Sequence, residues 1–211
     1  MNNKNNIFKQ RRPLIGILRG ITPLEAESIS DVLIEAGITI IEVPLNSPEP
    51  YKTIERMVKF HGKSAIFGAG TVLHINEVQT VSDCGGQIIV SPNLNTLVVK
   101  KTKNLNMLSF PGVYTPTECF DALQAGADGL KFFPASLLRE ENFKAINSVL
   151  PANTISIAVG GIDEKKFSSW LDVNISGFGL GSNLYKPGML VEEVKSRAQE
   201  IVKAYDNYFN P

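Results

Sequence analysis

The sequence predicts an α/β protein built as a single (β/α)8 barrel, the TIM barrel, with a short N-terminal extension. Short apolar runs recur along the chain and are separated by longer stretches with helical spacing. Most of these runs are apolar on both faces, which is typical of parallel strands covered by helices. About eight such β-α units in 211 residues match the lower size limit of the closed barrel.

The expected strands follow one another without a linker-like stretch, so we expect one domain over residues 1–211. A doubly wound open sheet is the alternative. No Gly-x-Gly-x-x-Gly turn follows the first run, which weakens the dinucleotide-binding version of that alternative. The strands are expected at residues 14–18, 39–43, 65–67, 87–90, 106–108, 129–132, 155–159 and 177–180.

Helix boundaries are visible between the strands. Residues 22–25 and 115–118 both have the order of a capping box, with a hydroxyl, a proline at the first turn and a reciprocating glutamate. The two helices that follow are expected to end before Gly37 and Gly126, where a left-handed cap leads into the next strand. Apolar residues three or four apart over residues 191–205 predict a last helix that packs on the sheet.

The composition excludes several classes of protein. Lysine plus arginine number 21 and aspartate plus glutamate number 21, so no excess of positive charge favours a nucleic acid partner. The asparagine-rich start lacks a secretory h-region, and no stretch approaches the roughly 18 apolar residues of a membrane span. Two cysteines, Cys84 and Cys119, are too few for a disulfide framework. We therefore expect a cytoplasmic protein with no membrane partner, and we interpret Arg11 and Arg12 as a solvated chain end.

Polar residues close several of the apolar runs. In a barrel of this kind the active site lies at the carboxyl ends of the strands, so these residues are candidates for it. They are Arg19, Glu42, Thr71, Pro92, Asn93 and Lys131.

Glu42 and Lys131 interrupt apolar strands, and an isolated buried charge is costly. Lys131 stands among Leu130, Phe132 and Phe133, where desolvation lowers the pKa of its amine and supplies a nucleophile that can form a Schiff base. Glu42 could then move protons. A structural Lys-Glu ion pair inside the barrel is the alternative, and the position of both residues favours catalysis.

The last two strands are followed by small residues, in the segments 159–162 and 179–182. Backbone amides of the loops after strands seven and eight commonly bind phosphate in such barrels. A single glycine pair is more often a turn, but two such loops at the two expected places favour a phosphate site. No metal site is expected, because His61 and His74 have no carboxylate or cysteine at ligand spacing.

Taken together, these residues resemble the class I aldolases that act on 2-keto-3-deoxy-6-phospho sugar acids, the KDPG/KHG aldolase family. The resemblance spans nearly the whole chain. The motifs that carry it are Ile17-Leu18-Arg19-Gly20, Ile41-Glu42-Val43-Pro44-Leu45-Asn46-Ser47-Pro48, Gly68-Ala69-Gly70-Thr71-Val72, Val90-Ser91-Pro92-Asn93, Phe110-Pro111-Gly112, Leu130-Lys131-Phe132-Phe133-Pro134, Gly160-Gly161 and Gly181-Ser182.

The resemblance implies a homotrimer of barrels that needs neither a metal nor a cofactor. It makes Lys131 the Schiff-base lysine and Glu42 the proton shuttle. The other positions carried over are binding residues for three parts of the substrate. They are Arg19 and Thr71 near the carboxylate, Pro92 and Phe133 in the pyruvate pocket, and Gly160, Gly161, Gly181 and Ser182 at the phosphate.

Two departures from the gluconate members of the family concern the substrate. Residues 44–47 are Pro-Leu-Asn-Ser where those members usually have Thr-Leu-Arg-Thr, and Val159 replaces a threonine. This pattern resembles the branch of the family whose substrate is derived from galactonate. That substrate is the carbon-4 epimer of the gluconate-derived one, and it is cleaved to pyruvate and glyceraldehyde 3-phosphate. With Asn46 in place of the usual arginine, Arg19 is the leading candidate for the anionic contact. Three alternatives stay open. The protein could be an enzyme for the gluconate-derived epimer, an enzyme that uses both epimers, or a non-catalytic phosphosugar-binding barrel.

Overall fold

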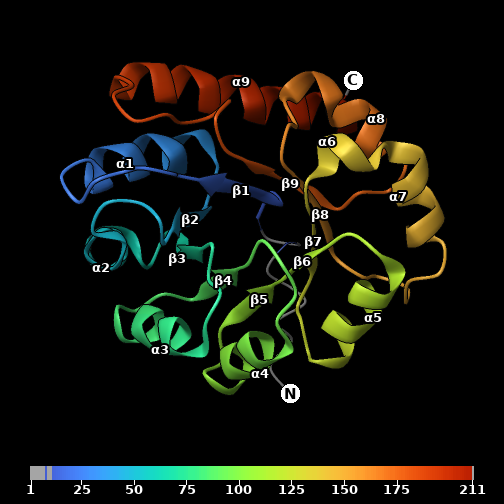
Figure 1. The fold of residues 1–211 in the computed structure, drawn as a ribbon. Helices are drawn as coiled ribbons and strands as arrows, with labels where there is room; N and C mark the ends of the chain where they lie inside the picture. The colour runs from blue at the N-terminus through green and yellow to red at the C-terminus, as the bar shows by residue number, and fades with distance from the viewer. Residues whose placement is uncertain (1–7, 9–10, 211) are drawn as a thin grey trace.

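The computed structural model describes Phe8 and residues 11–210, and it shows a closed barrel of parallel strands inside a ring of helices (Figure 1). The barrel confirms the predicted fold class. The asparagine-rich start that we interpreted as an extension, residues 1–7, lies outside the described residues.

The strand order of the described residues is β5-β4-β3-β2-β1-β9-β8-β7-β6, and every paired neighbour is parallel. β5 and β6 stand at the two ends of this order, yet only Pro111 separates them in the chain, so they are two halves of one barrel strand. The strands are β1 Leu14–Ile17, β2 Ile40–Pro44, β3 Ile66–Gly70, β4 Ile88–Val90, β5 Leu108–Phe110, β6 Gly112–Val113, β7 Leu130–Phe132, β8 Ser156–Val159 and β9 Gly177–Leu180.

The prediction for the fifth strand was therefore wrong in its limits. The expected run, residues 106–108, starts too early, because Asn106 is in the left-handed turn that follows the preceding helix, with φ 59°. The strand instead continues past Pro111, which has no N–H to donate to a ladder. The β5 half pairs with β4 and the β6 half pairs with β7, which closes the barrel.

The helices surround the strands on the outside of the barrel (Figure 1). No described helix is both long enough and apolar enough to span a membrane. The helices are α1 Ala26–Ala36, α2 Pro50–His61, α3 Ile75–Asp83, α4 Thr96–Asn104, α5 Pro116–Gln124, α6 Ala135–Leu138, α7 Glu140–Asn147, the 3-10 helix η2 Glu164–Lys166, α8 Phe167–Leu171 and α9 Val191–Phe209.

One of the two predicted capping boxes starts a helix as expected. In α5 the Thr115 side chain caps the helix and Glu118 reaches back to the Thr115 N–H. The prediction of a start at Pro23 was wrong, because α1 begins at Ala26. There Glu25 accepts hydrogen bonds from the Thr22 N–H at 3.0 Å and from the Thr22 hydroxyl at 2.6 Å, but no helix N–H donates to that hydroxyl.

Alternation along the strands divides the core into two layers. One set of side chains points outward and packs under the helices, and the other fills the inside of the barrel. Phe8 packs against the inner set, with its ring edge-on to Phe110 at 5.7 Å. The inner set is Ile15, Ile17, Ile40, Ile66, Ile88, Val90, Leu108, Phe110, Ile157 and Val159.

The arginine pair near the start of the described chain is not merely solvated, which corrects our interpretation. Arg12 makes a two-pronged ion pair with Asp206 of α9, at 2.7 and 2.8 Å. Arg11 donates to the Ser64 carbonyl at 2.8 Å. These contacts attach the segment before β1 to the rest of the barrel.

Candidate active site

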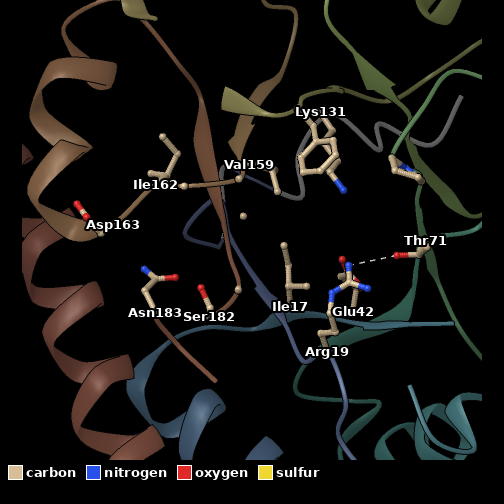
Figure 2. A pocket seen from close by; sticks show the side chains of 16 residues that line it. Ile17, Arg19, Glu42, Thr71, Lys131, Val159, Ile162, Asp163, Ser182 and Asn183 are labelled. Carbon is tan, nitrogen blue, oxygen red and sulfur yellow. Dashed lines mark hydrogen bonds between the residues drawn. The ribbon is translucent and has the colours of Figure 1, made fainter. Parts of the chain in front are cut away.

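A cavity of about 310 Å3 opens at the carboxyl ends of the strands (Figure 2). All eleven residues predicted as catalytic or substrate-binding line it: Arg19, Glu42, Thr71, Pro92, Lys131, Phe133, Val159, Gly160, Gly161, Gly181 and Ser182. Five further lining residues were not predicted: Ile17, Ile162, Asp163, Gly179 and Asn183. The structure thus brings together segments that belong to or follow seven different strands.

Lys131 reaches the cavity because of its place in β7. Its neighbours Leu130 and Phe132 belong to the outer core, so alternation turns Lys131 inward. The side chain is only 7% exposed, and its Nζ lies 4.9 Å from the centroid of the Phe133 ring. The amine is therefore held in a largely apolar environment with one aromatic face beside it.

Glu42 reaches the cavity by the same rule from β2. It follows Ile40 on the inner face and is in register with Ile17 of β1 and Gly68 of β3. The residue is 2% exposed, and its Oε2 has no hydrogen-bond partner among the described residues. A buried carboxyl oxygen without a partner is costly and can accept a hydrogen bond from a ligand in the cavity.

Burial changes the pKa values of Glu42 and Lys131 more than the charge of either group changes the pKa of the other. Burial raises the pKa of Glu42 to about 7, although Lys131, Arg19 and the Gly70 backbone amide each act to lower it. Burial also lowers the pKa of Lys131; the Glu42 charge opposes that change and the Arg19 charge adds to it. Burial thus favours the neutral amine on Lys131, and the Glu42 carboxyl can exchange a proton near pH 7.

Arg19 stands over the mouth of the cavity and is held from two sides. Its guanidinium donates to the Asn46 side-chain oxygen and to the Thr71 hydroxyl, the latter at 3.4 Å (Figure 2). The next residue, Gly20, donates its N–H to the Ser47 hydroxyl at 2.9 Å. Asn46 and Ser47, two and three residues after the end of β2, thus orient the Arg19 loop, a role that the sequence analysis missed.

Phe133 and Gly160 fit against each other beside the lysine. A Cβ on Gly160 would lie 3.1 Å from the Phe133 ring, and Gly160 has a left-handed φ of 93°. Both facts favour glycine there. Pro92 lines the same cavity from the loop after β4.

The two glycine loops present backbone amides that are free among the described residues. No protein acceptor is found there for the N–H groups of Gly161, Ile162, Ser182 and Asn183. Free amides of this kind form anion-binding sites. The arrangement suits a phosphate group.

A cation supports each of these loops from behind. Lys166 donates to the Gly161 carbonyl at 2.7 Å, and Arg197 donates to the Asn183 carbonyl at 3.2 Å. In a trans peptide the C=O and the N–H point in opposite directions. The bond to Gly161 therefore turns the Ile162 N–H away from Lys166.

Neither histidine lies in the cavity. His61 ends α2, with its Nε2 3.3 Å from Asp31, and His74 precedes α3. Within residue 8 and residues 11–210, no three His, Cys, Asp or Glu side chains are grouped so that they could hold a metal ion.

Comparison with known proteins gives relatives that cover most of this chain. A protein of Rhizobium meliloti (strain 1021) named "Probable 2-dehydro-3-deoxy-6-phosphogalactonate aldolase" is 48% identical over 195 residues, which is 92% of each chain. The "2-dehydro-3-deoxy-6-phosphogalactonate aldolase" of Escherichia coli (strain K12) is 41% identical over 94% of this chain and 97% of its own.

Structure comparison and the family model agree with these relatives. A solved structure described as "Native KDPGal structure" superimposes with a TM-score of 0.93 and 41% identity, covering 94% of this chain and 97% of that one. The model of the family "KDPG and KHG aldolase" matches residues 5–202. The chain belongs to the KDPG and KHG aldolase family.

Proposed function

We propose that this protein is a class I aldolase that cleaves 2-dehydro-3-deoxy-6-phosphogalactonate to pyruvate and D-glyceraldehyde 3-phosphate. The observation that carries this proposal is the pairing of a buried lysine and a buried glutamate on one small cavity, between loops suited to a carboxylate and to a phosphate. The two relatives above, at 48% and 41% identity, bear the name of this activity and support the choice of substrate.

Lys131 begins the reaction. Its neutral amine attacks the ketone carbon, C2, and the resulting carbinolamine loses water to give a protonated imine. The low pKa that burial gives the amine keeps a larger fraction of it nucleophilic at neutral pH. The imine then accepts the electron pair of the bond that breaks next.

Glu42 performs the proton transfers. As a carboxylate, directly or through a water, it takes the proton of the C4 hydroxyl. The C4 oxygen becomes the aldehyde of glyceraldehyde 3-phosphate, the C3–C4 bond breaks, and its electron pair forms an enamine on Lys131. The Glu42 proton can then be returned to C3, and water hydrolyses the imine to release pyruvate and the free amine.

The remaining residues divide between the two ends of the substrate. Arg19 and Thr71 would contact the keto-acid carboxylate, while Pro92 and Phe133 enclose the three carbons that become pyruvate. The free amides of the two loops would hold the phosphate, with the cations behind them adding positive potential. The residues that we expect around the phosphate are Gly160, Gly161, Gly181 and Ser182, together with the free amides of Ile162 and Asn183.

Val159 is the residue we expect to set the epimer preference. It faces the cavity from β8, is 6% exposed and offers no hydrogen bond to a hydroxyl at C4. Val159→Thr adds a donor of nearly the same size, which is worth about 0.5 to 1.5 kcal/mol. We expect the ratio of kcat/KM for the galacto over the gluco epimer to fall by roughly two- to tenfold.

The control for that change is Val159→Ala, which removes both methyl groups, including the one that the threonine hydroxyl replaces, and adds no hydroxyl. It should keep the original preference, whatever it does to the absolute rate. An unchanged ratio in Val159→Thr would mean that another residue sets the preference.

The proposed function is tested by pyruvate release from the 6-phosphogalactonate and 6-phosphogluconate keto-deoxy acids, side by side, as a ratio of kcat/KM. We expect a preference for the galacto epimer or near-equal use of both. A strong preference for the gluco epimer would overturn the substrate assignment. Release from neither would leave a phosphosugar-binding barrel in which Lys131 and Glu42 form an ion pair.

A homotrimer in the cytoplasm completes the proposal. Several large apolar side chains are exposed near the start of α3 and along α4 and α5, and neighbouring helices carry them. Such a surface favours association of copies. Sedimentation equilibrium should give three times the mass of one chain, and the mass of a monomer would contradict this part. The exposed residues are Leu73, Ile75, Leu97, Tyr114 and Phe120.

A further inference from the structure

Gly70 occupies an unusual place at the end of β3. A Cβ built on its backbone would lie 1.9 Å from Oε2 of Glu42, 2.2 Å from its Cδ and 2.3 Å from its Oε1. The three nearest atoms are thus the whole carboxyl group of one residue. The carboxyl occupies the volume that any side chain at position 70 would fill.

We propose that Gly70 is a positioning residue, whose missing side chain leaves the space in which the Glu42 carboxyl reaches its working position. The inference rests on the proposed function, because it concerns the proton transfer assigned to Glu42. The Gly70 backbone amide also favours the ionised carboxyl, since it acts to lower the pKa of Glu42.

Backbone conformation does not account for this glycine. Gly70 is not among the described residues with positive φ, and it lies within a buried strand in register with Pro44. An alanine can adopt such a conformation. The need for glycine therefore comes from Glu42.

The neighbouring inward glycine has a different reason. A Cβ on Gly68 would lie 1.9 Å from the Ile88 carbonyl oxygen, which is backbone of the adjacent strand β4. A substitution there would push two strands apart. At Gly70 the nearest obstacle is the end of a flexible side chain, so we expect the carboxyl to move and the two strands to stay in place.

The required movement is large on the scale of catalysis. Ordinary van der Waals contact with a Cβ begins at 3.4 Å, against the 1.9 Å found for Oε2. A displacement of about 1 Å can lower a rate about 10²-fold when a reacting group must be aligned. The three atoms nearest to the added methyl all belong to the Glu42 carboxyl, so the Lys131 amine lies farther from it than that group does.

We expect Gly70→Ala to fold and to lower kcat by about 10²-fold. Borohydride should still trap pyruvate on Lys131, because imine formation with pyruvate needs no C4 hydroxyl. The acid limb of the kcat profile should move to higher pH as the carboxyl leaves the Gly70 amide. If Gly70→Ala has an unchanged kcat and an unchanged acid limb in its pH profile, the inference is overturned.

The matched control is Gly16→Ala in β1. There the added Cβ meets Leu184, Ile38 and Leu33 at 3.4 to 3.7 Å, which is ordinary contact, and φ is not positive. Its kinetics should equal those of the unchanged protein. The control thus separates the effect of a methyl group on a buried strand from the effect of a methyl group against Glu42.

A double-mutant cycle tests whether Gly70 acts through Glu42. In a Glu42→Gln background, Gly70→Ala should cost no more than a few-fold, because the group it misplaces is already inactive. A full additional loss of about 10²-fold would overturn the inference. Full activity of Glu42→Gln alone would instead overturn the proton-transfer role that the proposed function gives to Glu42, so the two failures are distinguishable.

Folding supplies an independent measurement if Gly70→Ala is unstable. Glu42→Ala removes the three atoms that lie nearest to the new methyl. The pair Glu42→Ala and Gly70→Ala should therefore melt at the temperature of Glu42→Ala alone. A further large drop in melting temperature would mean that other contacts require the glycine, and would contradict the inference.

Discussion

Replacing Lys131 with methionine is expected to abolish turnover while the barrel stays folded. Methionine has a similar length and no amine, so no carbinolamine or imine can form. Loss of a covalent nucleophile commonly costs on the order of 10⁴-fold or more in kcat. The measurement is pyruvate release at saturating substrate, with circular dichroism and a thermal melt as the check on folding.

The environment of Lys131 explains why this variant should fold. The side chain is 7% exposed and packs beside Phe133, which suits a thioether. Glu42 loses its partner, but burial already raises the pKa of that carboxyl to about 7, so it can become neutral. Lys144→Met on the exposed side of α7 is the control and should leave kcat unchanged. Ordinary turnover by Lys131→Met would remove the Schiff base from the account.

Replacing Glu42 with glutamine is expected to lower kcat by about 10² to 10⁴-fold, the usual contribution of a positioned general base. Glutamine keeps the size of the side chain but cannot accept the C4 hydroxyl proton. KM should change much less than kcat, because Glu42 is proposed to act on the bond-breaking step.

The pH profile gives a second measurement on the same residue. A carboxyl with a pKa of about 7 is protonated below that pH and cannot act as a base, so kcat of the unchanged protein should fall as the pH drops through 7. The residual rate of Glu42→Gln should lack this limb. An acid limb of the same shape in both proteins would assign the limb to another group. Glu141→Gln, on the exposed start of α7, is the control.

The fold and the centre of the site were both predictable because they depend on local pattern. A charged residue two positions from an inward isoleucine must itself point inward, which is how Ile40 places Glu42. The same alternation places Lys131 between two outward apolar residues. Since parallel strands end at one rim of the barrel, residues far apart in the chain meet there.

What the sequence could not predict depends on contacts between distant segments. Asn46 holds Arg19, and Lys166 and Arg197 hold the carbonyls of the phosphate loops, but each of these side chains is an ordinary polar residue in its own segment. The Glu25 side chain, just before the late start of α1, likewise accepts a hydrogen bond from the distant Tyr185 at 3.0 Å. Such contacts follow only once the barrel is closed.

The central claim is that Lys131 forms a covalent imine with the keto acid, and borohydride reduction in the presence of pyruvate tests it most directly. The account predicts one stable pyruvate adduct per chain, located on the peptide that contains Lys131, with none formed without pyruvate and none in Lys131→Met. No adduct in the folded protein, or an adduct on a different lysine, would contradict the account.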